Sequence, residues 1–206
     1  MVRVSHATAQ SREVHADASN FTQSVTKADA YEQILLQAEG LFTGQRNWYK
    51  SGVGRTNLAR GSNLANAASL LWHAYKSLPA PMQDVNWAGF YVSDPTSPKP
   101  RLILGPFQGK VACQTIDFGR GVCGTAAATQ ETQLVADVDK FPGHIACDSD
   151  SRSEIVVPIL AEKDGRGAKE VVAIIDVDCA SLLGFDDLDR TYLEKLAELL
   201  ARSCDW

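Results

Sequence analysis

The chain has 206 residues, of which 45% are apolar and 22% charged, and its formal net charge is −5. These proportions are typical of one globular domain and argue against a disordered chain. The acidic balance provides no basic surface for a phosphate backbone, so we expect no nucleic acid partner. No apolar run reaches the ~20 residues of a membrane helix, and the N-terminus lacks the apolar segment of a secretory signal. We therefore expect a cytoplasmic protein without a membrane anchor.

The N-terminal region divides into an extension and a first helix. Residues 1–21 show neither helical nor strand periodicity and are predicted to form a flexible extension ahead of a single domain over residues 22–206. From Thr26, the sequence Thr-Lys-Ala-Asp resembles a capping box, and Gly40 suits a helix end. A helix is predicted between them, with its apolar stripe formed by Ile34, Leu35, Ala38 and Leu41.

The rest of the chain predicts a long loop, a helix, several strands and a last helix. Thr43–Ser62 is rich in Gly, Arg and Asn and predicts a surface loop. A helix before Pro79 is predicted by Leu64, Ala68, Leu71, Trp72 and Tyr75. Strands are predicted at Trp87–Val92, Arg101–Leu104, Val111–Ile116, Leu134–Ala136, Ile155–Leu160 and Val171–Asp178. Behind Asp186 and Asp187, a C-terminal helix is predicted by Leu188, Tyr192, Leu196, Leu200 and Cys204. This order favours an α+β domain with an antiparallel sheet.

The segment Gly119–Gly124 matches the glycine fingerprint of dinucleotide-binding folds. Only Thr125–Gln133 separate it from the next predicted strand, whereas a parallel crossover needs about a dozen residues. The acid at the required distance, Asp139, lies in a Pro- and Gly-containing loop. We therefore prefer a tight turn that brings backbone amides and Cys123 close to a small ligand.

Side-chain alternation in two predicted strands gathers polar and aromatic groups on one face of the sheet. In the last strand, Asp176 and Asp178 point to the same side, because residues i and i+2 share a face. The same rule places Trp87 and Tyr91 together, with Phe90 on the opposite, core-facing side. Two neighbouring carboxylates repel each other unless a cation or a shared proton lies between them. The pair therefore suggests a site, although a solvated face remains the alternative.

The five cysteines form an odd set in a chain long enough to fold without disulfides: Cys113, Cys123, Cys147, Cys179 and Cys204. In a reducing compartment a disulfide would be transient and catalytic. Cys179 and Cys204 have apolar neighbours and are predicted to be buried small hydrophobes. Cys147 lies in a turn-rich loop, which is typical of a redox-active thiol. A zinc protein is the weaker alternative, because no close pair of ligands is present; we assign no metal ligands.

These motifs resemble the free methionine-R-sulfoxide reductases, a family built on a GAF-type domain. The matching segments cover most of residues 86–178 and are Asn86–Tyr91, Leu104–Gln114, Gly119–Thr125, Pro142–Cys147, Ser153–Pro158 and Ile175–Asp178. The N-terminal extension and the loop around Gln45–Gly61 depart from the family pattern. The resemblance implies a GAF-like fold with a central antiparallel sheet between N- and C-terminal helices.

The resemblance also implies roles for individual residues. Cys147 is expected to be the nucleophile, and either Cys113 or Cys123 to resolve it. Expected to line the substrate pocket are Trp87, Tyr91, Glu154, Asp176 and Asp178. Crowding of the acids would raise one pKa, so that one acid protonates the sulfoxide oxygen while another stays charged and holds an ammonium group. The choice between the acids, with Glu154 and Asp178 as the candidate catalytic ones, stays open.

The activity implied by the resemblance is thiol-dependent reduction of free L-methionine (R)-S-oxide, with no cofactor and with thioredoxin as the external reductant. A residue within a peptide lacks the terminal charges, so a buried carboxylate aimed at an ammonium group would be unpaired. The R preference comes with the resemblance alone. The rival hypothesis is a non-catalytic GAF-type sensor that binds a small ligand on the same sheet face. Whether two copies pair as a homodimer through their helices stays open.

Overall fold

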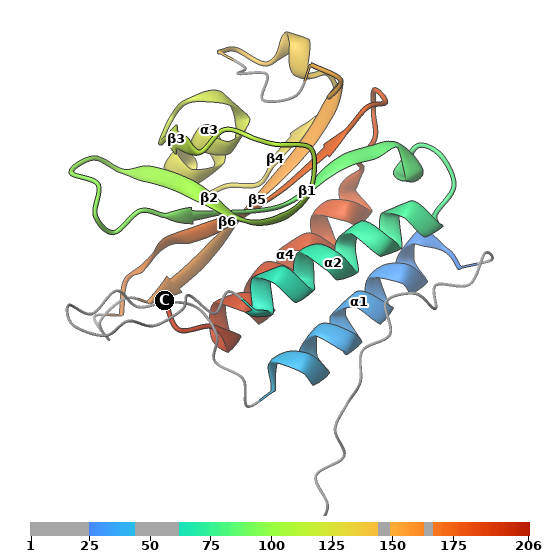
Figure 1. Ribbon diagram of the computed structural model, residues 1–206, viewed down its shortest axis with the longest axis horizontal. Coiled ribbons are helices and arrows are strands. Elements are labelled where there is room, and N and C mark those ends of the chain that lie inside the picture. The colour runs from blue at the N-terminus through green and yellow to red at the C-terminus, as the bar shows by residue number, and fades with distance from the viewer. Residues whose placement is uncertain (1–24, 44–61, 144–148, 163–166) are drawn as a thin grey trace, which may run out of the picture.

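The computed structural model describes residues 25–43, 62–143, 149–162 and 167–206 (Figure 1). At its centre is a six-stranded antiparallel sheet with the strand order β3-β2-β1-β6-β5-β4. Its strands are β1 (Val85–Ser93), β2 (Arg101–Gly109), β3 (Thr115–Asp117), β4 (Gln133–Val135), β5 (Ser153–Glu162) and β6 (Lys169–Cys179). The predicted α+β class and antiparallel sheet are confirmed. The predicted extension over residues 1–21 and most of the predicted loop before the second helix lie outside the described residues.

The helices form layers on the two faces of the sheet (Figure 1). Helices α2 (Ser62–Ser77) and α4 (Asp187–Ser203) pack on one face, with α1 (Lys27–Phe42) against both of them, while α3 (Gly121–Thr129) covers the opposite face. Two short 3₁₀ helices are η2 (Met82–Asp84) and η3 (Val138–Lys140). In the described ranges, no helix combines the length and the apolar character that crossing a membrane requires.

The predicted helix ends are close to the observed ones. Thr26 and Asp29 form the capping box that the sequence predicts at the start of α1, and α1 continues two residues beyond Gly40. At α4, Asp186 accepts hydrogen bonds from the backbone amides of the first turn, and Asp189 completes a second capping box. Each box satisfies amides that have no partner within the helix, which fixes where the helix begins.

The strand predicted at Val111–Ile116 is wrong in its first part. Gly109 at the end of β2 has a φ of +127°, a conformation that favours glycine and turns the chain away from the sheet. Val111 is consequently 88% exposed, and the chain rejoins the sheet only at Thr115. Cys113 therefore lies in a loop beside the sheet rather than in a strand.

Alternation along the central strands separates two apolar cores, as the sequence predicts. Phe90 and Val92 of β1 belong to the larger core, between the sheet and helices α1, α2 and α4. Trp87 and Tyr91 belong to the smaller core, between the sheet and α3. Strand β6 alternates in the same way, with Ile175 on the helix side. The sheet therefore has a largely apolar face and a second face that combines apolar and polar groups.

A buried polar network connects the three long helices. The Asp189 carboxylate is fully buried, and it accepts hydrogen bonds from the Lys27 ammonium at 2.7 Å and the Tyr31 hydroxyl at 2.8 Å. The Tyr31 and Tyr75 hydroxyl oxygens are 2.7 Å apart. A buried charge with several partners is costly to leave unpaired. This network therefore holds α4 against α1 and α2, and so stabilises the helical layer that packs against the sheet.

Candidate active site

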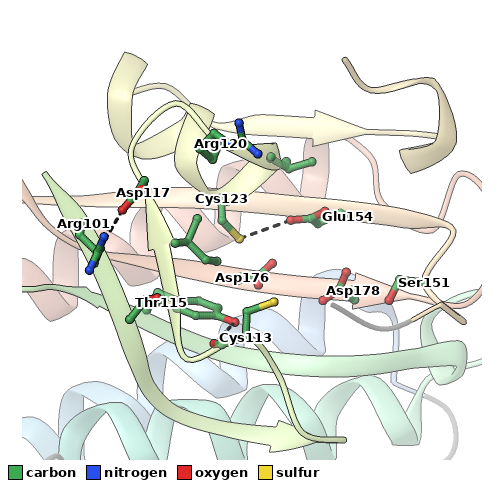
Figure 2. A pocket seen from close by; sticks show the side chains of 14 residues that line it. Arg101, Cys113, Thr115, Asp117, Arg120, Cys123, Ser151, Glu154, Asp176 and Asp178 are labelled. Atoms are coloured by element: carbon green, nitrogen blue, oxygen red, sulfur yellow. Dashed lines mark hydrogen bonds and ion pairs between the residues drawn. The ribbon is translucent and has the colours of Figure 1, made fainter. Parts of the chain in front are cut away.

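A pocket of about 220 Å³ lies on the sheet face that carries α3 (Figure 2). Three carboxyl groups from neighbouring strands line it: Glu154 of β5, and Asp176 and Asp178 of β6. Glu154 is directly opposite Asp178 in the strand pairing, and Asp176 lies two residues before Asp178. All three side chains therefore project from the same face, as the alternation in β6 predicts. Glu154 and Asp176 are both 5% exposed, so two of the acids are held away from water.

Cys123 reaches this pocket from the first turn of α3. The residue is 7% exposed, and its thiol donates a hydrogen bond to Glu154 Oε1, with a sulfur–oxygen distance of 3.5 Å (Figure 2). The helix packs closely on the turn that precedes it because Gly124 has no side chain. A Cβ at Gly124 would stand 2.4 Å from the carbonyl oxygen of Asp117. The glycine-rich segment predicted as a tight turn thus begins a helix, and the first turn of this helix carries the thiol that contacts Glu154.

Cys113 comes to the same pocket from the loop after β2. It is disulfide-bonded, whereas Cys123, Cys179 and Cys204 are not. The hydroxyl of Tyr91 donates to the Cys113 carbonyl oxygen at 3.0 Å, which connects the loop to β1. Cys179 and Cys204 are buried, as the sequence predicts. The fifth cysteine, Cys147, is outside the described residues.

Burial and mutual repulsion shift the proton affinities in the pocket. Burial, followed by the charges of Asp176 and Asp178, raises the pKa of Glu154 well above its usual range. Burial raises the pKa of Asp176 to about 6. The pKa of the Cys123 thiol also rises well above its usual value, first through burial and then through the neighbouring acids. At neutral pH the site therefore favours a proton on Glu154 and a neutral Cys123 thiol.

An aromatic stack backs one side of the pocket. Tyr91 lines the pocket directly, whereas Trp87 lies behind it, with ring centroids 5.8 Å apart. Trp87 also stacks on Phe107 at 5.1 Å. Between Trp87 and Tyr91, a Cβ at Gly89 would stand 2.8 Å from the Trp87 ring and 2.3 Å from Phe107. Glycine at this position thus allows the three rings to pack closely together, although Trp87 was expected in the pocket wall itself.

The structure adds pocket residues that sequence reasoning missed: Arg101, Asp117, Arg120 and Ser151. The Arg101 Nε–Asp117 Oδ1 distance of 2.7 Å follows from the direct pairing of these residues between β2 and β3. Arg120 precedes α3 and was inside the glycine-rich segment already singled out. Ser151 accepts a hydrogen bond from Asn86 at 3.0 Å. Apart from Arg120, these side chains reach the pocket through strand pairing and loop folding. A short sequence motif does not indicate such placements.

The sheet topology excludes the dinucleotide-binding alternative. All strand pairs of the six-stranded sheet are antiparallel, whereas the glycine fingerprint acts at the start of a crossover between parallel strands.

Three pocket residues could hold a metal ion. Cys123, Glu154 and Asp176 offer ligand atoms that all lie within 4.8 Å of one another.

Comparison with known proteins gives one consistent result. The family model of the GAF domain matches residues 67–203. The free methionine-R-sulfoxide reductase of Saccharomyces cerevisiae is 53% identical, over 92% of this chain and 94% of that protein. The protein of the same name from Escherichia coli is 40% identical, over 68% of this chain and 75% of that protein. The structure of the Neisseria meningitidis free methionine-R-sulfoxide reductase, solved with its substrate, superposes with a TM-score of 0.70 at 39% identity, covering 87% of this chain and 91% of that one.

The fold and the pocket thus define a GAF domain whose pocket is lined by two cysteines and several carboxyl groups. The 53% identity to the yeast reductase, over 92% of this chain, narrows the assignment from a GAF domain to one family of such domains. The chain belongs to the family of free methionine-R-sulfoxide reductases.

Proposed function

We propose that this chain reduces free L-methionine (R)-S-oxide to L-methionine with its own cysteines as the electron source. The observation that carries the proposal is the pocket itself, in which Cys113 and Cys123 face three carboxyl groups in a volume of about 220 Å³. Drug-sized ligands occupy pockets of about 300–1,000 Å³, so this volume suits a single amino acid. The 53% identity to the yeast reductase supports the same activity.

Cys147 is the proposed nucleophile. Its thiolate attacks the sulfoxide sulfur, the S–O bond of the substrate breaks, and the oxygen is left on Cys147 as a sulfenic acid. The methionine sulfur gains the two electrons that the cysteine sulfur loses. The Cys113 thiol then attacks the sulfenic sulfur, an S–S bond forms, and the oxygen leaves as water with the thiol proton. The disulfide at Cys113 supports its resolving role, because Cys123, the other candidate, is not disulfide-bonded.

Cys123 is then a pocket thiol and not the resolving cysteine. It is a free thiol while Cys113 is disulfide-bonded, and burial together with the nearby acids raises its pKa. A thiol with a raised pKa is a poor nucleophile, since the thiolate is the reactive form. Its hydrogen bond to Glu154 instead helps to orient that acid.

The three acids divide the remaining work between them. Glu154 has the strongly raised pKa, so it holds a proton at neutral pH and is the proposed proton donor to the sulfoxide oxygen. Asp176, with a pKa of about 6, is mostly ionised at pH 7 and is suited to hold the substrate ammonium group together with Asp178. Tyr91, backed by Trp87, offers an apolar surface for the S-methyl group. These ion contacts favour a free amino acid over a residue in a peptide, which lacks the ammonium group.

Turnover requires an external dithiol, for which we propose thioredoxin in the cytoplasm. The attacking thiolate must reach the disulfide, and Cys113 is only partly buried in its loop. The exchange returns two electrons to the enzyme and leaves the disulfide on the partner. A homodimer through the helices stays a prediction.

Thioredoxin-coupled NADPH oxidation with each epimer of free methionine sulfoxide tests the proposal. We expect NADPH consumption with the R epimer, little with the S epimer, and loss of activity in Cys147→Ser. Cys204→Ser, which changes a buried thiol in α4's C-terminal cap, serves as the matched control and should keep the activity. Activity that survives Cys147→Ser would refute the assigned nucleophile. Binding of the sulfoxide without reduction of either epimer would favour the sensor hypothesis instead.

A further inference from the structure

Three potential ligand atoms converge in the pocket from separate elements. Cys123 Sγ comes from α3, Glu154 from β5 and Asp176 from β6, and their ligand atoms all lie within 4.8 Å of one another (Figure 2). All three residues are buried. One thiol and two carboxyl groups are thus held together by the fold, without a contribution from the disulfide at Cys113.

The distance between two of the three ligand atoms matches a tetrahedral metal site. With a metal–sulfur distance of about 2.3 Å and a metal–oxygen distance of about 2.0 Å, neighbouring ligand atoms in a tetrahedron are about 3.5 Å apart. The Cys123 Sγ–Glu154 Oε1 distance is 3.5 Å. Small side-chain rotations within the 4.8 Å limit would complete the third vertex at Asp176.

A second observation points to a ligand at this place. The Asp176 side chain is buried, yet its Oδ1 has no hydrogen-bond partner among the residues that the structure describes. A buried oxygen without a partner is destabilising. A divalent cation would provide the missing partner and neutralise the acids. A thiolate among the ligands favours Zn²⁺ over Mg²⁺ or Ca²⁺, which prefer oxygen alone.

We propose that Cys123, Glu154 and Asp176 form a Zn²⁺-binding site, and that Zn²⁺ bound there excludes the sulfoxide. Binding displaces the thiol proton and the proton on Glu154 into solvent, because the ligands bind in their deprotonated forms. All three residues line the pocket, so a fourth ligand would come from the cavity. The inhibitory role rests on the proposed function, because it requires the same acids to bind substrate; the metal site itself does not.

Co²⁺ binding to the disulfide form of the protein tests the site directly. In that form Cys113 cannot provide a thiolate, so a thiolate-to-Co²⁺ charge-transfer band would report on Cys123. We expect one Co²⁺ per chain, displaced by Zn²⁺. Cys123→Ser should remove the band and weaken Zn²⁺ binding at least ~10-fold, and Asp176→Asn should weaken binding similarly but keep the band. Cys179→Ala, which removes a buried thiol on the opposite sheet face, should change neither measurement.

A band that persists in Cys123→Ser, or no binding to the unsubstituted protein, would overturn the metal site. Circular dichroism of each variant shows whether it is folded. The inhibitory role is tested with pre-reduced, desalted enzyme, by counting methionine released per chain with and without Zn²⁺. If Zn²⁺ lowers the amount of methionine released, and excess sulfoxide or a chelator restores it, the inhibitory role is supported. If Zn²⁺ does not change the amount of methionine released, the inhibitory role is contradicted. A Co²⁺ site in a protein that releases no methionine even without metal would support the site and overturn the proposed function.

Discussion

Replacing Asp176 by Asn should stabilise the fold while it damages the pocket. Burial raises the pKa of Asp176 from 3.8 to about 6, so the folded state holds its proton more tightly than the unfolded chain does. A carboxyl group with a raised folded pKa contributes most stability below its unfolded pKa, and this contribution is lost as the pH rises through the folded pKa. Above about pH 6 the folded protein must therefore carry a buried charge that Asn does not have.

The size of the effect follows from the shift. A difference of about 2 pKa units corresponds to about 3 kcal/mol between low and high pH. About half of this cost is already present at pH 5, because the unfolded carboxyl group has ionised there. The stabilisation of Asp176→Asn should consequently be about 1–1.5 kcal/mol larger at pH 8 than at pH 5.

Urea unfolding of the disulfide form at both pH values measures this difference, with m-values compared to confirm two-state behaviour. Asp139→Asn is the matched control, because its side chain is 70% exposed and its substitution should not change the pH dependence. An equal stabilisation at pH 5 and pH 8, or a loss at pH 8, would contradict the conclusion that burial of this carboxylate opposes folding.

Three further predictions concern the thiols, the helix and the polar network. Cys113→Ser should release one methionine per enzyme and then stop, as counted by chromatography with pre-reduced protein; continued turnover would assign the resolving role to another thiol. Gly124→Ala places a methyl group 2.4 Å from the Asp117 carbonyl oxygen, so we expect about 1–3 kcal/mol of destabilisation and reduced reductase activity. An unchanged melting temperature would show that α3 can shift freely. Asp189→Asn should cost about 1–3 kcal/mol in urea unfolding, because Tyr31 loses its charged acceptor and Lys27 keeps only its ion pair with Asp186, while the folded fraction keeps its activity; a coupled activity loss would connect this network to the pocket.

The strand faces could be predicted because they depend on a period of two. Trp87 and Tyr91 project to the pocket side and Phe90 to the helix side, as the sequence indicates. The same rule places Asp176 and Asp178 together in the pocket. Cap residues such as Asp186 were equally predictable, because a cap acts on the helix that immediately follows it.

The sequence does not reveal α3, because its residues show no apolar periodicity and include two glycines, Gly121 and Gly124. Without this helix, Cys123 could not be placed beside Glu154. The strand predicted from Val111 was wrong because the backbone turn at Gly109, rather than β propensity, decides where the chain leaves the sheet. Such placements depend on long-range packing that local patterns do not contain.

The central claim is that Cys147 receives the oxygen and Cys113 closes the disulfide. It is tested most directly by mass-spectrometric peptide mapping of fully reduced protein after one equivalent of free methionine (R)-S-oxide, with free thiols blocked in acid. We predict a single new crosslink between the peptides that contain Cys113 and Cys147, and an alkylated Cys123. A crosslink that includes Cys123, or methionine release with both Cys113 and Cys147 still alkylated as free thiols, would contradict the account.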